Sequence, residues 1–231
     1  MSRSHAHRIL VVTAVEMERE AVLRGLGLEH QFSDEDSAGR DRILVRAGGV
    51  GMAAAAAATA RTLTAAELSG EPFGLVISAG VAGGFAGRAD VGATVLASRS
   101  VAADLGAEAP NGFLSLDALG FGSSIVETEP KVLATLEEAL PDVIVGEVLT
   151  VSTVTGTVER AAALLARRPE AVAEAMEGFG VASAASQAGV AFAEVRTISN
   201  PVGPRDRALW RIPEALAALT GSARAMASLE P

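Results

Sequence analysis

Strand-like apolar runs alternate with helical segments along almost the whole chain, and this alternation most constrains the fold. The first run, at residues 9–13 (ILVVT), is rich in β-branched residues, as in strands buried on both faces of a sheet. Further strands are expected at residues 43–46, 75–78, 94–98, 147–151, 171–176 and 192–198, and helices at 16–26, 52–63, 130–139, 158–167, 179–187 and 213–227. The alternation predicts the α/β fold class, with a mostly parallel sheet covered by helices on both sides.

Domain organisation follows from length and composition. The 231 residues contain no low-complexity linker and no change of composition, so a single domain spanning residues 1–231 is expected. Two segments have no clear period. Residues 31–41 are polar, which indicates a hairpin or loop, whereas residues 105–124 are rich in glycine and stay unassigned.

Composition excludes several classes of site and partner. The chain has no cysteine, so disulfides, thiolate metal sites and a cysteine nucleophile are excluded, and only three histidines, among them His5 and His7 near the start, offer imidazole ligands. The net charge of −9 disfavours nucleic acid and anionic membrane surfaces as partners. No run of 18 apolar residues is present, and Glu16 and Glu18 interrupt the apolar stretch near the start, so we expect a cytoplasmic protein without membrane span or signal peptide.

Polar or glycine-rich clusters follow several of the expected strands. They are Glu16 and Glu18, a turn at residues 48–51, a second glycine-rich turn at residues 80–84, Glu177, and the pair Ser199 and Asn200. In open α/β sheets, ligands bind at the carboxyl ends of strands, so convergence of these clusters on one edge would form a site. Each cluster alone also has a structural explanation, because carboxylates stabilise the first turn of a helix and glycines permit tight connections.

The order of these clusters carries a family resemblance. The segments Ala14-Val15-Glu16-Met17-Glu18, residues 47–51 (AGGVG), residues 78–84 (SAGVAGG), residues 175–177 (AME) and residues 198–200 (ISN) resemble the nucleoside phosphorylase/nucleosidase superfamily and its bacterial nucleosidases. Within this superfamily, residues 174–180 and 198–210 are similar to the enzymes that hydrolyse futalosine in menaquinone biosynthesis. The resemblance covers nearly the whole chain, and it implies a single-domain three-layer α/β/α fold with a mixed, mostly parallel central sheet.

The resemblance also implies roles for individual residues. Glu18 would bind and polarise the attacking water, Glu177 would bind the ribose hydroxyls, and Asn200 would act on the base as it leaves. The other expected substrate-binding residues are Met176, Gly80, Val81, Ser199 and, for the face of the purine, Val154 or Phe179, because no aromatic residue stands at the family's usual position in residues 151–156. The family needs no metal and no organic cofactor, and its members form homo-oligomers, so a small purine nucleoside and further copies of this chain are the expected partners.

Asn200 bears on which base is cleaved. Breaking a purine N-glycosidic bond leaves negative charge on the base, which must be protonated or hydrogen-bonded at N7. Related nucleosidases of methylthioadenosine and S-adenosylhomocysteine have an aspartate at this position. An ionised carboxylate repels the carbonyl oxygen at C6 of hypoxanthine, whereas an asparagine amide offers N–H donors to O6 or N7. Asn200 therefore favours a 6-oxopurine over adenine.

A cluster of arginines follows Asn200. Futalosine carries a benzoate remote from its purine, and an arginine fork suits a carboxylate. Among Arg205, Arg207 and Arg211, we expect Arg205 to contribute to this recognition or to order its loop. An ordinary surface ion pair is an equally good interpretation of Arg205.

Four alternative functions can be compared with this hypothesis. A phosphorylase needs cations around phosphate, but the first loop holds Glu16 and Glu18 instead. A methylthioadenosine/S-adenosylhomocysteine nucleosidase is disfavoured by Asn200. A non-catalytic nucleoside-binding protein on the same fold is possible in principle, although both Glu18 and Glu177 are present. A dinucleotide-dependent oxidoreductase lacks its glycine fingerprint after the first strand.

Overall fold

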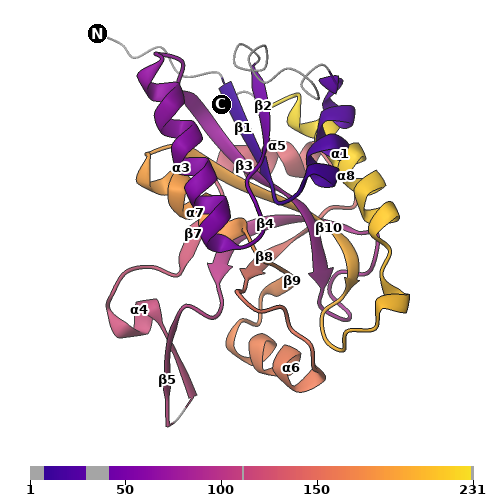
Figure 1. Ribbon diagram of the computed structural model, residues 1–231. Coiled ribbons are helices and arrows are strands. Elements are labelled where there is room, and N and C mark those ends of the chain that lie inside the picture. The colour runs from indigo at the N-terminus through magenta and orange to yellow at the C-terminus, as the bar shows by residue number, and fades with distance from the viewer. Residues whose placement is uncertain (1–7, 30–41, 111, 230–231) are drawn as a thin grey trace.

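Helices and strands alternate along the chain as the sequence predicts (Figure 1). The computed structural model describes residues 8–29, 42–110 and 112–229. The expected loop at residues 31–41 lies outside the described residues, as do His5 and His7. The helices expected at residues 130–139 and 158–167 have the predicted bounds, α5 (Pro130–Ala139) and α6 (Val158–Arg167).

The central sheet is mixed, with most of its pairings parallel. Its strands are β1 (Arg8–Thr13), β2 (Ile43–Ala47), β3 (Phe73–Gly84), β4 (Thr94–Ala102), β7 (Ile125–Glu127), β8 (Ile144–Thr150), β9 (Ala171–Ala175) and β10 (Ala191–Pro201). The order is β10-β4-β8-β9-β3-β1-β2, with β7 beside β4. Because β10 also pairs with β3, the five strands β3, β9, β8, β4 and β10 close into a ring, and β1 and β2 extend the sheet from it.

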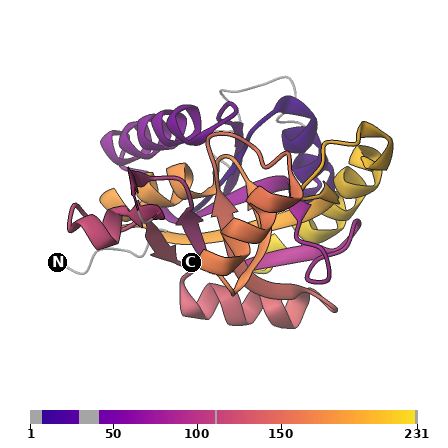
Figure 2. The same cartoon turned by 90° about the horizontal axis from the view of Figure 1, so that it is seen from below.

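Helices cover both faces of the sheet, which confirms the three-layer prediction. On one face, α5 packs with α1 (Glu16–Leu26) and α8 (Ile212–Met226) over a core of aliphatic side chains from β1, β3 and β10. On the other face, α3 (Met52–Leu68) and α7 (Gly178–Gln187) pack side by side over a second core. Figure 2 shows α3 and α5 on opposite sides of the sheet.

The sequence predicts a turn at the glycine-rich residues 80–84. This prediction is wrong, because these residues form the second half of β3. It pairs with β10 along one side, and Gly83 and Gly84 pair with β9 on the other. A Cβ atom on Gly84 would lie 2.0 Å from the carbonyl oxygen of Ala89, so glycine lets the neighbouring backbone approach this strand. Likewise, Ser199 and Asn200 belong to β10, beside a register irregularity that follows Ile198.

The segment at residues 105–124, unassigned from the sequence, forms a small arm. It contains a hairpin of β5 (Gly106–Ala109) and β6 (Gly112–Ser115), followed by the short helix α4 (Leu116–Leu119). The arm lies away from the main sheet in Figure 1. Across the described residues, none of the helices has the length and apolar character needed to span a membrane.

Candidate active site

A cavity of about 350 Å³ lies where the ends of β1, β3, β9 and β10 meet. Most of the residues predicted from the sequence lie in its wall, namely Glu18, Val81, Val154, Met176, Glu177, Ser199, Asn200 and Arg205. They come from segments far apart in the chain. The sheet therefore brings the predicted residues together as the hypothesis requires.

Two predicted residues lie near the cavity but not in its wall. Gly80 lies behind Glu18, because a Cβ atom at Gly80 would be 2.6 Å from Glu18 Oε1. Phe179 is buried at the start of α7, where its backbone N–H donates to Thr150 Oγ1 at 2.9 Å. Phe179, which the sequence suggested as an aromatic face for the base, therefore packs beside the cavity and does not line it.

Glu18 is held by three backbone donors. It stands in the first turn of α1, and its Oε2 accepts from the N–H groups of Ala14 at 2.9 Å and Val15 at 3.2 Å. Its Oε1 accepts from the N–H of Val81 at 2.8 Å. Only 4% of Glu18 is exposed, so its carboxylate loses most of its hydration, and these three hydrogen bonds compensate for that loss. A carboxylate has about four acceptor positions, so about one is left for a further donor.

Glu177 is positioned by the first glycine turn. It stands at the N-cap position of α7 without a capping bond from its side chain, and its Oε1 accepts from the N–H of Gly51 at 3.0 Å. Gly49 and Gly51 have φ angles of 93° and 91°, a backbone region that glycine adopts at little cost. The turn between β2 and α3 is therefore shaped to present an N–H group to Glu177, which confirms the turn expected at residues 48–51.

Arg196 links the buried carboxylates around the site. Its side chain is fully buried, with Nε donating to Glu194 Oε1 at 2.8 Å and Nη2 donating to Ser78 Oγ at 2.9 Å. Its Nη1 lies 3.5 Å from Glu177 Oε2 and has no hydrogen-bond partner among the described residues. Burial alone lowers the pKa of Arg196, but the carboxylates of Glu194, Glu177 and Glu18 outweigh this effect and raise it. Arg196 therefore remains a cation behind the two cavity carboxylates.

The amide of Asn200 has a defined orientation. Its Oδ1 lies 2.8 Å from the hydroxyl of Ser199, which donates to it, and its Nδ2 donates to the carbonyl oxygen of Pro201 at 3.0 Å. One of the two hydrogens on Nδ2 is thereby used. The other hydrogen can donate to a ligand in the cavity, which fits the preference for a 6-oxopurine expected from Asn200.

Glu174 is a third buried carboxyl group in the cavity wall, beside Glu18 and Glu177. Its Oε1 accepts from the backbone N–H of Thr155 at 2.7 Å, and its Oε2 accepts from the Thr155 hydroxyl at 2.5 Å. Burial raises the pKa of the Glu174 carboxyl, and the two hydrogen bonds from Thr155 offset only part of this effect. The carboxyl thus fastens β9 to the loop that follows β8, which also carries Val154.

The open end of the cavity holds an aromatic and a basic side chain. Trp210 and Ile212 line it together with the exposed Arg205. The guanidinium carbon of Arg205 lies 5.4 Å from the centre of the Trp210 ring, and that of Arg207 lies 5.9 Å from it. Both distances are within cation–π range, so the indole ring helps to order the two arginines.

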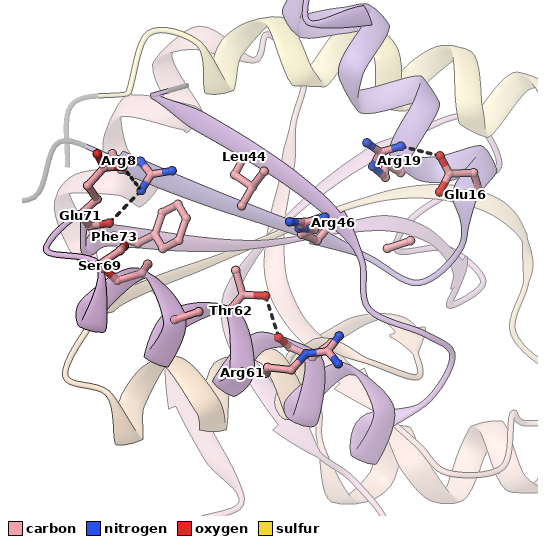
Figure 3. Close-up of a pocket in the computed structure, with 14 residues that line it drawn as sticks. Arg8, Glu16, Arg19, Leu44, Arg46, Arg61, Thr62, Ser69, Glu71 and Phe73 are labelled. Carbon is pink, nitrogen blue, oxygen red and sulfur yellow. Dashed lines mark hydrogen bonds and ion pairs between the residues drawn. The ribbon is translucent and has the colours of Figure 1, made fainter. Parts of the chain in front are cut away.

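A larger hollow, of about 600 Å³, lies between β2 and α3 (Figure 3). Its wall contains Arg19, Arg46 and Glu16, and Glu16 Oε1 forms an ion pair with Arg19 Nη1 at 2.6 Å. The two glutamates that follow β1 therefore lie in the walls of different hollows. Only Glu18 lies with the other predicted residues, so we place the site in the smaller cavity, where polar groups converge.

Four residues of the site or its immediate support were not predicted from the sequence. Arg196 and Glu194 stand two residues apart in a strand whose preceding residues are apolar, a spacing that places both on one face and could have indicated a buried ion pair. Glu174 and Trp210 stand in the segments that carry the family resemblance, at residues 174–180 and 198–210, but no sequence pattern indicated a role in the site for either of them. Among the described residues, no group of three or more potential ligands is placed to hold a metal ion.

Comparison with known proteins gives consistent matches. The model of the phosphorylase superfamily matches residues 8–229. Futalosine hydrolase of Streptomyces coelicolor is 51% identical over 223 residues, which cover 92% of each chain. Among solved structures, a methylthioadenosine/S-adenosylhomocysteine nucleosidase of Neisseria meningitidis, in complex with methylthio-immucillin-A, has a TM-score of 0.76 at 21% identity, covering 96% of this chain and 100% of the other. Futalosine hydrolase of Helicobacter pylori has a TM-score of 0.75 at 18% identity, covering 96% and 97%.

Proposed function

The chain belongs to the phosphorylase superfamily, and we propose that it hydrolyses the N-glycosidic bond of futalosine, with release of hypoxanthine. The observation that carries the proposal is the convergence of Glu18, Glu177 and Asn200 on one cavity, in a chain half identical to the Streptomyces coelicolor enzyme. The three side chains supply what the reaction needs: Glu18 binds the attacking water, Glu177 binds the ribose hydroxyls, and Asn200 donates a hydrogen bond to the leaving base.

The chemistry requires a positive centre at the sugar and a nucleophile beside it. Glycosidic cleavage passes through an oxocarbenium-like transition state, which carboxylates near the ring stabilise. Glu18, with one acceptor position left, binds and orients the attacking water and takes its proton. Glu177 binds the ribose hydroxyls, and Met176 packs against the sugar. Arg196 keeps both carboxylates in place from behind by partly neutralising their charge.

The leaving base carries negative charge as the bond breaks. Asn200, with Oδ1 engaged by Ser199, presents an N–H group that can stabilise O6 or N7 of the departing hypoxanthine. Donors that are fixed before the reaction lower the barrier without reorganisation. The orientation set by Ser199 therefore contributes to rate as well as to base preference.

Water is favoured over phosphate as the nucleophile. Among the described residues that line the cavity, Arg205 is the only cation, and it stands at the exposed end beside Trp210. A phosphorylase needs cationic donors around its anionic nucleophile. We therefore expect turnover that does not depend on phosphate.

The proposal is tested by release of the free base, followed by liquid chromatography. We expect hypoxanthine from futalosine at the same rate with and without phosphate, and much slower release from its 6-amino analogue, methylthioadenosine and inosine. Adenine release from methylthioadenosine as the main reaction would move the protein to the other nucleosidase class. Binding of purine nucleosides without release of base would support a non-catalytic role.

Replacing Asn200 with aspartate should change which base is cleaved. An ionised aspartate repels O6 of hypoxanthine but can accept from the amino group of adenine, so the preference should move toward the 6-amino analogue. Since a mismatched buried polar pair costs about 1–3 kcal/mol, the ratio of kcat/KM values should change by about 10- to 100-fold. The measurement is kcat/KM of the Asn200→Asp variant on both substrates. An unchanged ratio would show that Asn200 does not distinguish the bases.

The benzoate of futalosine has a candidate partner at the open end of the cavity. Arg205 and Trp210 combine a cation with a flat apolar surface, which suits an aromatic carboxylate. In the same chromatographic assay, Arg205→Ala should raise KM for futalosine and leave KM for the short substrate inosine unchanged. Equal KM values for futalosine in the variant and the wild type would remove Arg205 from substrate binding.

A further inference from the structure

Glu174 is a buried carboxyl group in the cavity wall to which the proposed mechanism gives no task. It is separate from the cluster around Arg196, because its two hydrogen bonds go to Thr155 and neither reaches a charged partner. Each carboxyl oxygen receives one of these bonds, and each has a second acceptor position. A buried carboxylate with acceptor capacity facing a ligand cavity is suited to a hydrogen-bond donor on the ligand.

The strand register places Glu174 and Asn200 on the two sides of Gly83. Gly83 of β3 pairs with Glu174 of β9 on one side and with Asn200 of β10 on the other. Residues in register on neighbouring strands present their side chains on the same face, and two strand spacings separate the outer pair by about 10 Å between Cα atoms. All three residues line the cavity.

Gly83 places no side chain of its own between Asn200 and Glu174. A Cβ atom there would lie 2.9 Å from Val202 Cγ2 and 3.4 Å from Asn200 Nδ2, so a larger residue would crowd the amide. Asn200 and Glu174 thus border the part of the cavity wall formed by Gly83, where Val202 Cγ2 is the nearest side-chain atom. One border supplies an N–H donor and the other supplies carboxyl acceptors.

The edge of a 6-oxopurine has the complementary pattern. N1 of hypoxanthine carries a hydrogen and is a donor, next to the O6 acceptor, whereas N1 of adenine is an acceptor next to an amino donor. We propose that Glu174 accepts a hydrogen bond from N1–H of the base while Asn200 donates to its O6 or N7, so that the two side chains select a 6-oxopurine together. This inference rests on the proposed function, and it gives Glu174 the task of a specificity residue.

Base selection by Glu174 differs from a purely structural role in its consequences. If Glu174 only fastened the loop at Thr155, its loss would disturb the site for every substrate alike. If it accepts from N1–H, its loss removes a favourable contact with hypoxanthine and also a repulsion of N1 of adenine. The ratio of kcat/KM values for futalosine and its 6-amino analogue therefore separates the two roles.

The test compares Glu174→Gln and Glu174→Met with the control Thr155→Val. The first variant weakens the acceptor and the second removes it, at similar side-chain length. The control removes the hydroxyl bond to Glu174 but keeps the carboxylate. We expect kcat/KM for futalosine divided by kcat/KM for its 6-amino analogue to fall by about 10-fold in Glu174→Gln and by up to about 100-fold in Glu174→Met. The same ratio should stay at the wild-type value in Thr155→Val. A ratio that stays unchanged in both Glu174 variants, with equal losses on the two substrates, would overturn the inference.

Failure of the proposed function can be told apart from failure of this inference. If the wild-type protein releases no base from futalosine, the proposed function fails, and calorimetric Kd values for free hypoxanthine and adenine take the place of the rates. Tighter binding of hypoxanthine by the wild type, with that preference lost in Glu174→Gln, supports the assignment of Glu174. A preference that is absent in the wild type, or that survives in the variant, contradicts it.

Discussion

Replacing Glu18 with glutamine is expected to lower kcat for futalosine by about 10²- to 10⁴-fold, the usual contribution of a general base. An amide cannot take a proton from the attacking water, yet it has nearly the same shape as the carboxyl group. The N–H groups of Ala14, Val15 and Val81 donate to the carboxylate, and an amide oxygen can keep only part of these bonds. Because the task of Glu18 is realised mainly in the transition state, KM should change little.

Glu16→Gln is the matched control for this prediction. Glu16 stands on the same turn of α1, but it lines the hollow between β2 and α3 and pairs with Arg19 there. Its replacement should leave kcat near the wild-type value. Steady-state kinetics of the two variants, with circular dichroism to verify folding, is the measurement. Equal kcat values in Glu18→Gln and Glu16→Gln would remove Glu18 from the mechanism.

Much of the fold could be predicted because its strands are buried on both faces and its helices have clear periods. The segments that became α5 and α6 were bounded correctly, since Pro130 marks one helix start and an amphipathic pattern marks the other. The residues at 80–84 were misjudged for a physical reason. Glycine favours turns, but here it occurs in β3 because the backbone near Ala89 packs directly against the strand, a contact that local sequence does not encode.

The candidate site was predicted in its main parts and missed in its supporting ones. Glu18, Glu177 and Asn200 were predicted because each follows or ends a strand at the edge where ligands bind, and because their segments resemble the nucleosidase family. Arg196 and Glu174 stand inside strands, and their importance depends on which side chains the sheet places next to them. Glu174 and Asn200 lie on the two sides of Gly83 only because β9 and β10 both pair with β3, which is distant from them in the sequence.

Arg196→Met is expected to destabilise the protein by about 3–5 kcal/mol, the usual cost of removing one partner from a buried ion pair. The guanidinium is fully buried and donates to Glu194 and Ser78, so methionine would fill much of its volume but leave the Glu194 carboxylate without a cation. Burial already raises the pKa of Glu194, and Arg196 opposes that rise. Urea unfolding should show a lower midpoint for the variant, with a similar slope.

The double variant Arg196→Met/Glu194→Leu separates the stabilising role of Arg196 from its role in the site. Replacing a whole buried ion pair with apolar side chains is often neutral or stabilising, so most of the lost free energy of unfolding should return. Activity should not return, because Glu18 and Glu177 would still lack the buried cation whose Nη1 lies 3.5 Å from Glu177 Oε2. A double variant as active as the wild type would show that Arg196 serves only the fold. A stable variant with little activity would show that the buried cation, although outside the cavity wall, holds the two carboxylates in their working arrangement.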